Sequence, residues 1–206
     1  MKILMINPPD SGRSIPEEEY GVTSFKQIFK GEPFGIEVIA GALSGHDLMI
    51  LDMKCEKEEA LWRTVSDFRP QVIGFTAVTC EANTVLRYAR KLREDHDCVI
   101  VVGGNHATCD PSYFNREEID YIVIGVGKKS FSELISRIQK GERGTEIPGI
   151  AKTSAGSSLS YLPSSVSAGA AVGRRGRRGG GRGRHESAEK EGGVCGGLVP
   201  EGCGRG

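Results

Sequence analysis

Short apolar runs alternate with amphipathic segments along residues 1–162. Five runs rich in Val, Ile and Leu predict buried strands, at residues 2–6, 47–52, 72–76, 98–102 and 121–124. Apolar residues that recur every three or four positions predict helices between them, at residues 34–43, 57–68, 81–95 and 130–139. A further short helix is predicted to begin near Pro111.

The regular alternation of strands and helices predicts a parallel sheet covered by helices on both faces. The strands are apolar along almost their whole length, which is typical of strands buried on both sides. Right-handed crossovers between parallel strands then limit the possible topologies. We therefore expect an α/β domain over residues 1–145, with a doubly wound parallel five-stranded sheet of flavodoxin-like order 2-1-3-4-5.

The chain beyond this domain divides into two parts. Residues 147–151 and 158–162 are short apolar segments joined by Ala155-Gly156-Ser157, and they predict a small terminal β-hairpin over residues 146–162. From Pro163 onward, Gly, Arg, Ser, Ala and Glu dominate and apolar periodicity is lost. Such a composition cannot bury enough apolar surface to offset its conformational entropy, so residues 163–206 are predicted to be a disordered tail.

The net charge of zero, from 27 basic and 27 acidic residues, conceals a difference between these parts. Residues 1–162 carry 19 Lys and Arg against 23 Asp and Glu, whereas residues 163–206 carry 8 against 4. An Arg/Gly-rich block at residues 174–184 favours electrostatic contact with nucleic acid. Because no Phe or Tyr is interleaved with these arginines, we interpret that binding as adventitious, and we keep nucleic-acid binding through the tail as an alternative function.

Two kinds of sequence feature are missing, and their absence limits the class of protein. No apolar run approaches the roughly 18 residues of a membrane span, and no signal-peptide pattern precedes Asn7, so we predict a cytoplasmic protein without membrane contact. The six cysteines include no Cys-x-x-Cys pair, which favours reduced thiols over a disulfide framework or a metal site.

Glycines follow two neighbouring predicted strands, at Gly103-Gly104 and at Gly125-Val126-Gly127. A missing Cβ lets a bulky ligand approach the backbone, and ligands of open parallel sheets bind at the carboxyl ends of the strands. The loops at this edge offer hydroxyls, amides and one imidazole with few charges, which suits a nucleotide-containing cofactor with a large flat group. The candidate cofactor-binding residues are Asn7, Pro8, Pro9, Thr76, Thr79, Gly103, Gly104, Asn105, His106, Ala107, Thr108, Gly125, Val126 and Gly127.

Each of these residues also has a simpler interpretation. Glycine at a strand end is common in turns, and Thr76 or Thr79 could cap a helix. His106 lies where a ligand would bind, and we expect it to contact the periphery of that ligand rather than to coordinate a metal. The joint placement of these residues at one edge is what indicates a binding site.

The segment Gly103-Gly104-Asn105-His106-Ala107-Thr108-Cys109-Asp110-Pro111, followed by Asp120-Tyr121-Ile122-Val123-Ile124-Gly125-Val126-Gly127, resembles the cobalamin-binding domain at the front of cobalamin-dependent radical SAM proteins. The opening strand with Asn7-Pro8-Pro9, and Phe34-Gly35-Ile36, are also similar to that family. The resemblance covers about residues 1–162. It implies that the carboxyl edge holds the corrin ring, with the nucleotide tail or loop packed against the glycine-rich strand ends.

The sequence departs from the family pattern in several places. The Asp-x-His-x-x-Gly signature, which supplies a histidine to cobalt in relatives, is absent, so no protein ligand to the metal is expected. Gly125-Val126-Gly127-Lys128 stands where the family tends to have Gly-Glu-Gly-Glu. The cluster motif Cys-x-x-x-Cys-x-x-Cys is also absent. We therefore expect no iron–sulfur cluster in this chain, and a protein truncated before the radical SAM domain.

These observations predict a cobalamin-binding module of a radical SAM-type protein, a methyltransferase or related radical enzyme, that is inactive alone. Its expected partners are cobalamin and a separate radical SAM domain or substrate protein. A receiver-like signalling or nucleotide-binding domain is an alternative with the same topology. A receiver needs acidic residues after the first and third strands, where this chain has Asn7-Pro8-Pro9 and Thr76-Ala77-Val78; Lys128 is its one supporting residue.

Overall fold

The computed structural model describes residues 1–9, 32–142, 146–153 and 157–163. The chain divides into two units, Met1–Gly173 and Arg174–Gly206, and every described residue belongs to the first. The predicted disordered tail, apart from Pro163, and most of the loop after the first strand therefore lie outside the described residues.

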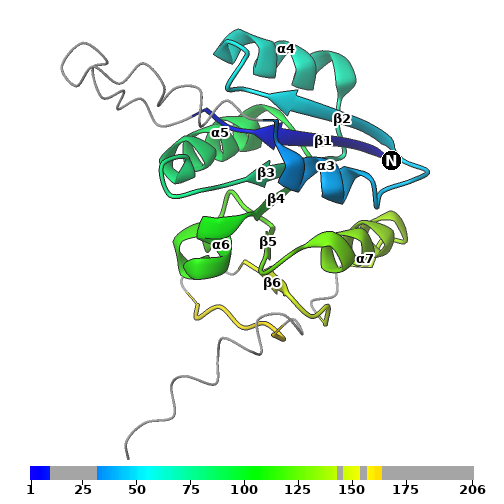
Figure 1. Ribbon diagram of the computed structural model, residues 1–206, viewed down its shortest axis with the longest axis vertical. Coiled ribbons are helices and arrows are strands. Elements are labelled where there is room, and N and C mark those ends of the chain that lie inside the picture. The colour runs from blue at the N-terminus through cyan, green and yellow to red at the C-terminus, as the bar shows by residue number, and fades with distance from the viewer. Residues whose placement is uncertain (10–31, 143–145, 154–156, 164–206) are drawn as a thin grey trace, which may run out of the picture. The chain divides into compact units, whose positions relative to one another are not determined.

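The described residues form a six-stranded sheet of order β2-β1-β3-β4-β5-β6 (Figure 1). Its parallel strands are β1 (Lys2–Asn7), β2 (Asp47–Asp52), β3 (Val72–Thr76), β4 (Val99–Gly103) and β5 (Tyr121–Val123). They confirm the predicted flavodoxin-like order. β1 pairs with β2 on one side and β3 on the other, so the direction of winding reverses between β1 and β3.

The sixth strand, β6 (Ile150–Lys152), comes from the segment predicted as a hairpin. It pairs antiparallel with β5, while its link to the second predicted arm is one bridge, Ala151 to Tyr161, and a hydrogen bond from Gly149 N to Leu162 O of 2.7 Å. Ile150 and Ala151 are fully buried. Burial of these apolar residues explains why the segment extends the main sheet.

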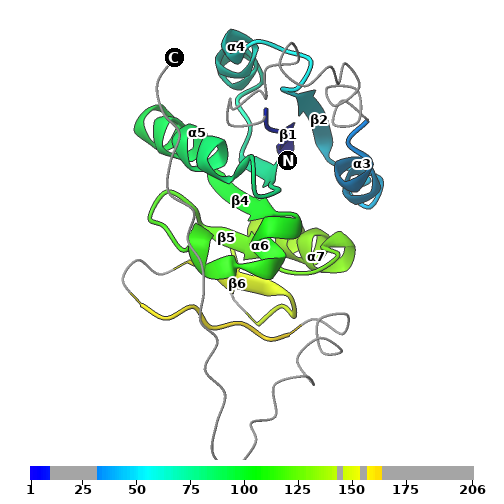
Figure 2. The same ribbon diagram turned by 60° about the vertical axis from the view of Figure 1, so that its left-hand side comes forward.

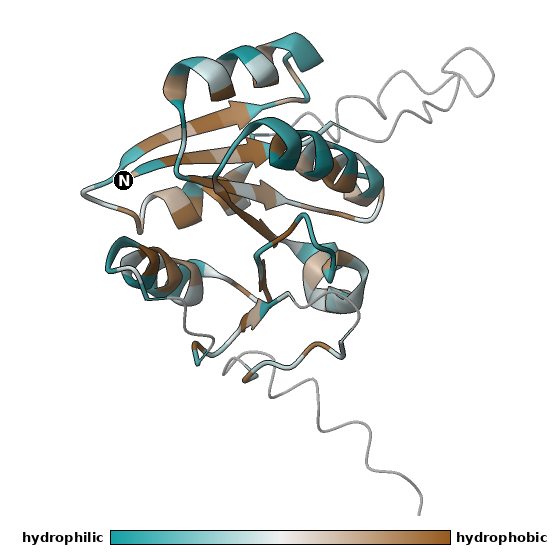
Figure 3. Cartoon of the chain, turned by 180° about the vertical axis from the view of Figure 1, so that it is seen from behind, coloured by the Kyte–Doolittle hydropathy of each residue, from teal (hydrophilic) through white to brown (hydrophobic). Residues whose placement is uncertain are grey.

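Helices cover both faces of the sheet. They are α3 (Phe34–Ala40), α4 (Glu58–Phe68), α5 (Ala82–Asp95), α6 (Asn105–Cys109), the 3-10 turn η1 (Pro111–Phe114) and α7 (Lys128–Gln139). α3 and α7 bury apolar residues in one core cluster, and α4, α5 and η1 do so in another. Figure 2 shows α3 and α7 on one side of the sheet and α5 on the other. Figure 3 shows apolar residues gathered on the strands, with polar residues on the outward helix surfaces.

α6 was not expected, because residues 105–109 were predicted to belong to a loop. Its five residues are too short to show helical periodicity in the sequence. Two backbone hydrogen bonds define the turn, from Thr108 N to Gly104 O at 3.1 Å and from Asp110 N to His106 O at 2.8 Å.

Candidate functional site

A cavity of about 130 Å³ lies between the carboxyl-terminal parts of the central strands and helices α3 and α7. The strands contribute Met5, Gly74, Phe75, Thr76, Val101, Gly103 and Val123 to its lining. The remaining lining residues are Gly35, Ile36, Ile39, Gly104, Gly125, Val126, Gly127 and Phe131. No lining residue is charged, and a site that encloses a whole drug-sized ligand is larger, about 300–1,000 Å³. The cavity therefore suits one uncharged, ring-sized group of a larger ligand.

Glycines keep this space open. A Cβ on Gly74 would lie 2.8 Å from the Met5 sulfur, and one on Gly103 would lie 3.3 Å from the Val123 Cβ. A Cβ on Gly127 would lie 3.1 Å from a Val123 methyl carbon. Side chains at these three positions would crowd the cavity wall or fill the cavity itself.

Gly104 joins the loops that follow β3 and β4. Its φ is +100°, and a Cβ there would lie 2.7 Å from Ala77 N and 2.8 Å from Ala77 O. The two loops exchange backbone hydrogen bonds, from Ala77 N to Gly103 O at 2.9 Å and from His106 N to Ala77 O at 3.0 Å. Glycine at position 104 is therefore required by both its φ angle and this close backbone approach.

Thr108 connects the loops after β4 and β5. Its hydroxyl donates to Gly104 O at 2.9 Å and accepts from Gly125 N at 3.0 Å. This small side chain thus satisfies two backbone groups at neighbouring strand ends.

His106 lies at the same edge but outside the cavity lining. Its Nδ1 is 3.2 Å from the Thr79 hydroxyl, and its ring packs edge-on against Tyr113 and Phe114 at centroid distances of 4.9 and 5.6 Å. Its Nε2 is buried and has no hydrogen-bond partner. The imidazole is therefore held by Thr79 and by the protein's own aromatic rings.

The candidate residues thus divide into two groups. Six line the cavity: Thr76, Gly103, Gly104, Gly125, Val126 and Gly127. The other eight do not: Asn7, Pro8, Pro9, Thr79, Asn105, His106, Ala107 and Thr108. Ala107 is fully buried in the core, and the Asn7 amide donates to Asp52 Oδ1 at 2.8 Å. These two side chains have structural partners at the edge of the sheet.

Sequence reasoning missed the helix side of the cavity and its floor, including Gly35, Ile39, Gly74 and Phe131. A signal for Gly74 was present, since an isolated glycine within an apolar strand often marks close approach of a ligand or another backbone. No comparable signal existed for Ile39 and Phe131, because an apolar residue lining a cavity has the same helical spacing as one in a filled core.

Two further properties concern the described residues alone. No group of three or more His, Cys, Asp or Glu side chains within these ranges is arranged to hold a metal ion. None of the helices in the described part of the chain is both long and apolar enough to cross a membrane.

Comparisons with known proteins identify similar sequences. Residues 26–135 match the family model described as the B12 binding domain. The chain is 32% identical over 158 residues to an uncharacterised methyltransferase of Pyrococcus horikoshii, covering 73% of this chain and 31% of the relative. It is 28% identical over 165 residues to the anaerobic magnesium-protoporphyrin IX monomethyl ester cyclase of a Synechocystis species, covering 73% and 30%. The chain thus spans about 30% of the length of these relatives.

Similar solved structures support the fold. The radical S-adenosylmethionine methyltransferase TsrM from Kitasatospora setae, solved with cobalamin and a 4Fe–4S cluster bound, gives a TM-score of 0.63 at 19% identity. That match covers 80% of this chain and 29% of TsrM. The cobalamin-dependent S-adenosylmethionine radical enzyme OxsB gives 0.59 at 14% identity, covering 79% and 22%. At these identities the likeness concerns the fold alone.

Proposed function

The chain belongs to the B12-binding domain family, and from this premise we propose that residues 1–162 form a cobalamin-binding module of a radical SAM-type protein. One observation carries the proposal: a glycine-lined, uncharged cavity opens at the carboxyl ends of the strands, beside the reversal between β1 and β3. In doubly wound sheets this is where ligands bind.

The uncharged lining fits the flat base at the nucleotide end of cobalamin better than the phosphate, the ribose or the amide groups of the cofactor. A flat base could enter the glycine-lined space beside Phe131, with Thr76 as the hydroxyl-bearing lining residue. The broader corrin ring would lie on the rim, near the loops that carry Thr79 and His106. When bound, cobalamin supplies cobalt-centred chemistry, and this chain's residues would hold it and shield its buried end from water.

We further propose that the module presents the cobalt face to a substrate held by a radical SAM domain, in the same or a separate protein. Support comes from its relatives, which include a methyltransferase and a cyclase about three times as long as the matched segment. A module that only binds and orients the cofactor is expected to be inactive without that partner.

Binding is tested by mixing the purified chain with hydroxocobalamin and separating the mixture by gel filtration. We expect the corrin absorbance to elute with the protein. A colourless protein peak at saturating hydroxocobalamin would refute the proposed function.

Two substitutions on one helix localise the site. Ile39 lines the cavity, whereas the adjacent Val38 is 53% exposed and does not. Ile39→Trp should fill the cavity and weaken cobalamin binding by about tenfold or more, a loss of about 1.4 kcal/mol. Val38→Trp should bind like the wild type. Equal affinities for the two variants would place the ligand elsewhere.

A further inference from the structure

A buried ion pair lies at the same edge of the sheet, outside the cavity lining. Lys54 Nζ is 2.8 Å from Glu81 Oε1, and the two side chains are 14% and 2% exposed. Taking two charges out of water is costly, and such a pair is weak evidence for added stability. The segment that the pair holds in place is therefore more informative than the contribution of the pair to stability.

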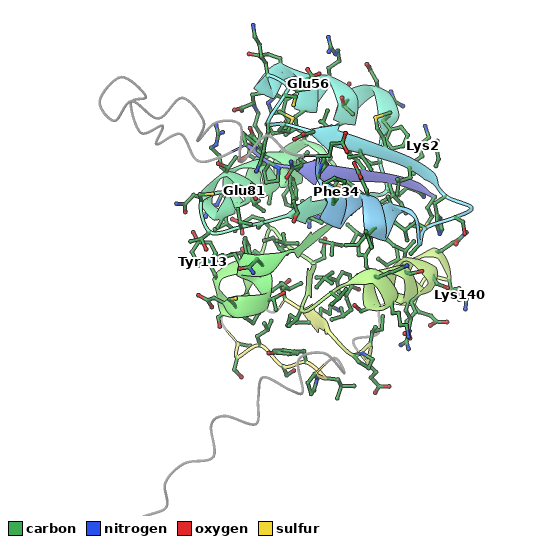
Figure 4. All side chains as sticks on the ribbon, viewed as in Figure 1. Lys2, Phe34, Glu56, Glu81, Tyr113 and Lys140 are labelled. Atoms are coloured by element: carbon green, nitrogen blue, oxygen red, sulfur yellow. The ribbon has the colours of Figure 1, made fainter. Side chains whose placement is uncertain are left out.

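Glu81 fixes the loop between β3 and α5. Its second carboxylate oxygen accepts a hydrogen bond from Val78 N at 2.9 Å, and its own N–H donates to Val78 O at 3.0 Å. Residues 78–81 are thereby closed into a compact turn. Figure 4 shows Glu81 on the same side of the sheet as Tyr113, which packs against His106.

Lys54 is held in turn by the end of β2. Its backbone N–H donates to Asp52 Oδ1 at 3.1 Å, and the same oxygen accepts from the Asn7 amide. A chain of polar contacts therefore runs from the end of β1, across the end of β2, to the loop after β3.

The loop after β3 is thus fixed from two sides. On the β4 side, the Ala77 backbone is hydrogen-bonded to the backbone of Gly103 and His106, and the Thr79 hydroxyl contacts the His106 ring. On the β2 side, the Lys54–Glu81 pair fixes it. Val78 is 37% exposed and Thr79 is also exposed, so both side chains of this loop are accessible from solvent.

We propose that Lys54 and Glu81 are positioning residues for cobalamin: they hold residues 77–80 in the conformation that binds the cofactor, without touching it. This inference rests on the proposed function. An apparent affinity is reduced by the fraction of molecules that are binding-competent. If losing the pair leaves about a tenth of the molecules with an ordered loop, affinity falls about tenfold.

The test uses the full chain with Lys54→Met, Glu81→Gln and the double variant. The control is Arg87→Met, which breaks an exposed ion pair with Glu58 at 3.1 Å. Three quantities are measured: hydrogen exchange of the Val78 amide without cobalamin, the cobalamin dissociation constant, and the thermal midpoint. Val78 exchange is informative because Lys54→Met leaves the Glu81 acceptor of that amide in place.

We expect each single variant to raise Val78 exchange and the dissociation constant by about tenfold, while Arg87→Met changes neither. The double variant should recover thermal stability because no charge remains buried alone, yet its affinity should stay low. A merely structural pair would instead recover affinity together with stability, and that result would overturn the proposal. Wild-type affinity in both single variants would overturn it as well.

Failure of the proposed function gives a different pattern. If the wild-type chain retains no cobalamin, the cobalamin role of the pair is refuted with the proposed function. The Val78 exchange data then still decide whether the pair orders the loop.

Discussion

Strands β4 and β5 are connected to each other differently at their carboxyl ends and at their amino ends. At the carboxyl ends, backbone groups and the Thr108 hydroxyl satisfy one another, and the cavity remains open beside them. At the amino ends, one long side chain connects the elements: Arg93 donates to Cys98 O, Glu118 O and Asp120 Oδ2 at 3.0, 3.1 and 2.6 Å. The comparison indicates that short contacts between backbone groups leave open space at the carboxyl ends of the strands. At the amino ends, the long Arg93 side chain spans the distance between the elements instead.

The largest effect is expected at the carboxyl ends of the strands, which we call the open end. Gly104→Ala places a Cβ at φ +100° within 2.8 Å of the Ala77 backbone, so we expect a loss of about 3 kcal/mol in the free energy of unfolding. Urea denaturation measures it. Gly35→Ala is the control, because a Cβ at that helical position has no neighbour within 4 Å and should change stability by no more than about 1 kcal/mol. Similar losses for both variants would mean that the close backbone approach carries no special cost.

Arg93→Met tests the amino ends of the strands, which we call the closed end. It removes three hydrogen bonds, one of which is also the ion pair with Asp120, and should cost about 2 kcal/mol in urea denaturation. Cobalamin affinity should not change, because Arg93 lies at the end of the sheet away from the cavity. Arg137→Met breaks only a surface pair with Glu133 on α7 and should cost about 0.5 kcal/mol or less. Weaker cobalamin binding by Arg93→Met would show that the two ends are coupled.

A smaller effect concerns pH at the closed end. Burial acts to raise the pKa of Glu118, but the hydrogen bond from Arg90 and the nearby positive charges outweigh it and hold that pKa below its ordinary value of 4.5. A lowered folded-state pKa stabilises the fold above about pH 4.5, and this contribution is lost as pH falls through the folded-state pKa. Because Arg90 is largely exposed, we expect less than about 1 kcal/mol. Urea denaturation from pH 7 to pH 3 should show a weaker acid dependence in Arg90→Met than in the wild type.

The smallest perturbation is chemical labelling of thiols at the two ends. Burial raises the pKa of the Cys98 thiol at the amino end to about 11, whereas Cys109 at the carboxyl end is exposed. Alkylation by iodoacetamide at pH 8, followed by mass spectrometry, should modify Cys109 and spare Cys98. Rapid labelling of Cys98 in the folded protein would mean that the amino end opens more readily than its contacts indicate.

The arrangement of the sheet was predictable because strand patterns and crossover handedness are local or general constraints. The bounds predicted for the second and third strands, residues 47–52 and 72–76, agree with β2 and β3. The position of Ile150–Lys152 was not predictable, since a short apolar segment does not specify which edge it joins. α6 was missed because one helical turn shows no periodicity.

The candidate site was predictable to the extent that it depends on glycines at strand ends. Gly103, Gly104, Gly125 and Gly127 line the cavity as a group because parallel strands bring their carboxyl ends to one edge. The Lys54–Glu81 pair was not foreseen. Its members are 27 positions apart, and an isolated Lys or Glu in a sequence is most often a solvated surface residue.

By itself, the amino-acid sequence determined which segments become the parallel strands, in which order they lie, and at which edge of the sheet the glycine-lined cavity opens. Those properties follow from apolar spacing and from residues that lack a Cβ. The sequence did not show that β2, an edge strand, has no buried residue. Only the tertiary structure decided which of the candidate residues share a cavity, that His106 is enclosed by Thr79, Tyr113 and Phe114, and that a buried ion pair holds the neighbouring loop. The reason is that cavities and buried charges depend on distances between segments far apart in the chain, which no local pattern encodes.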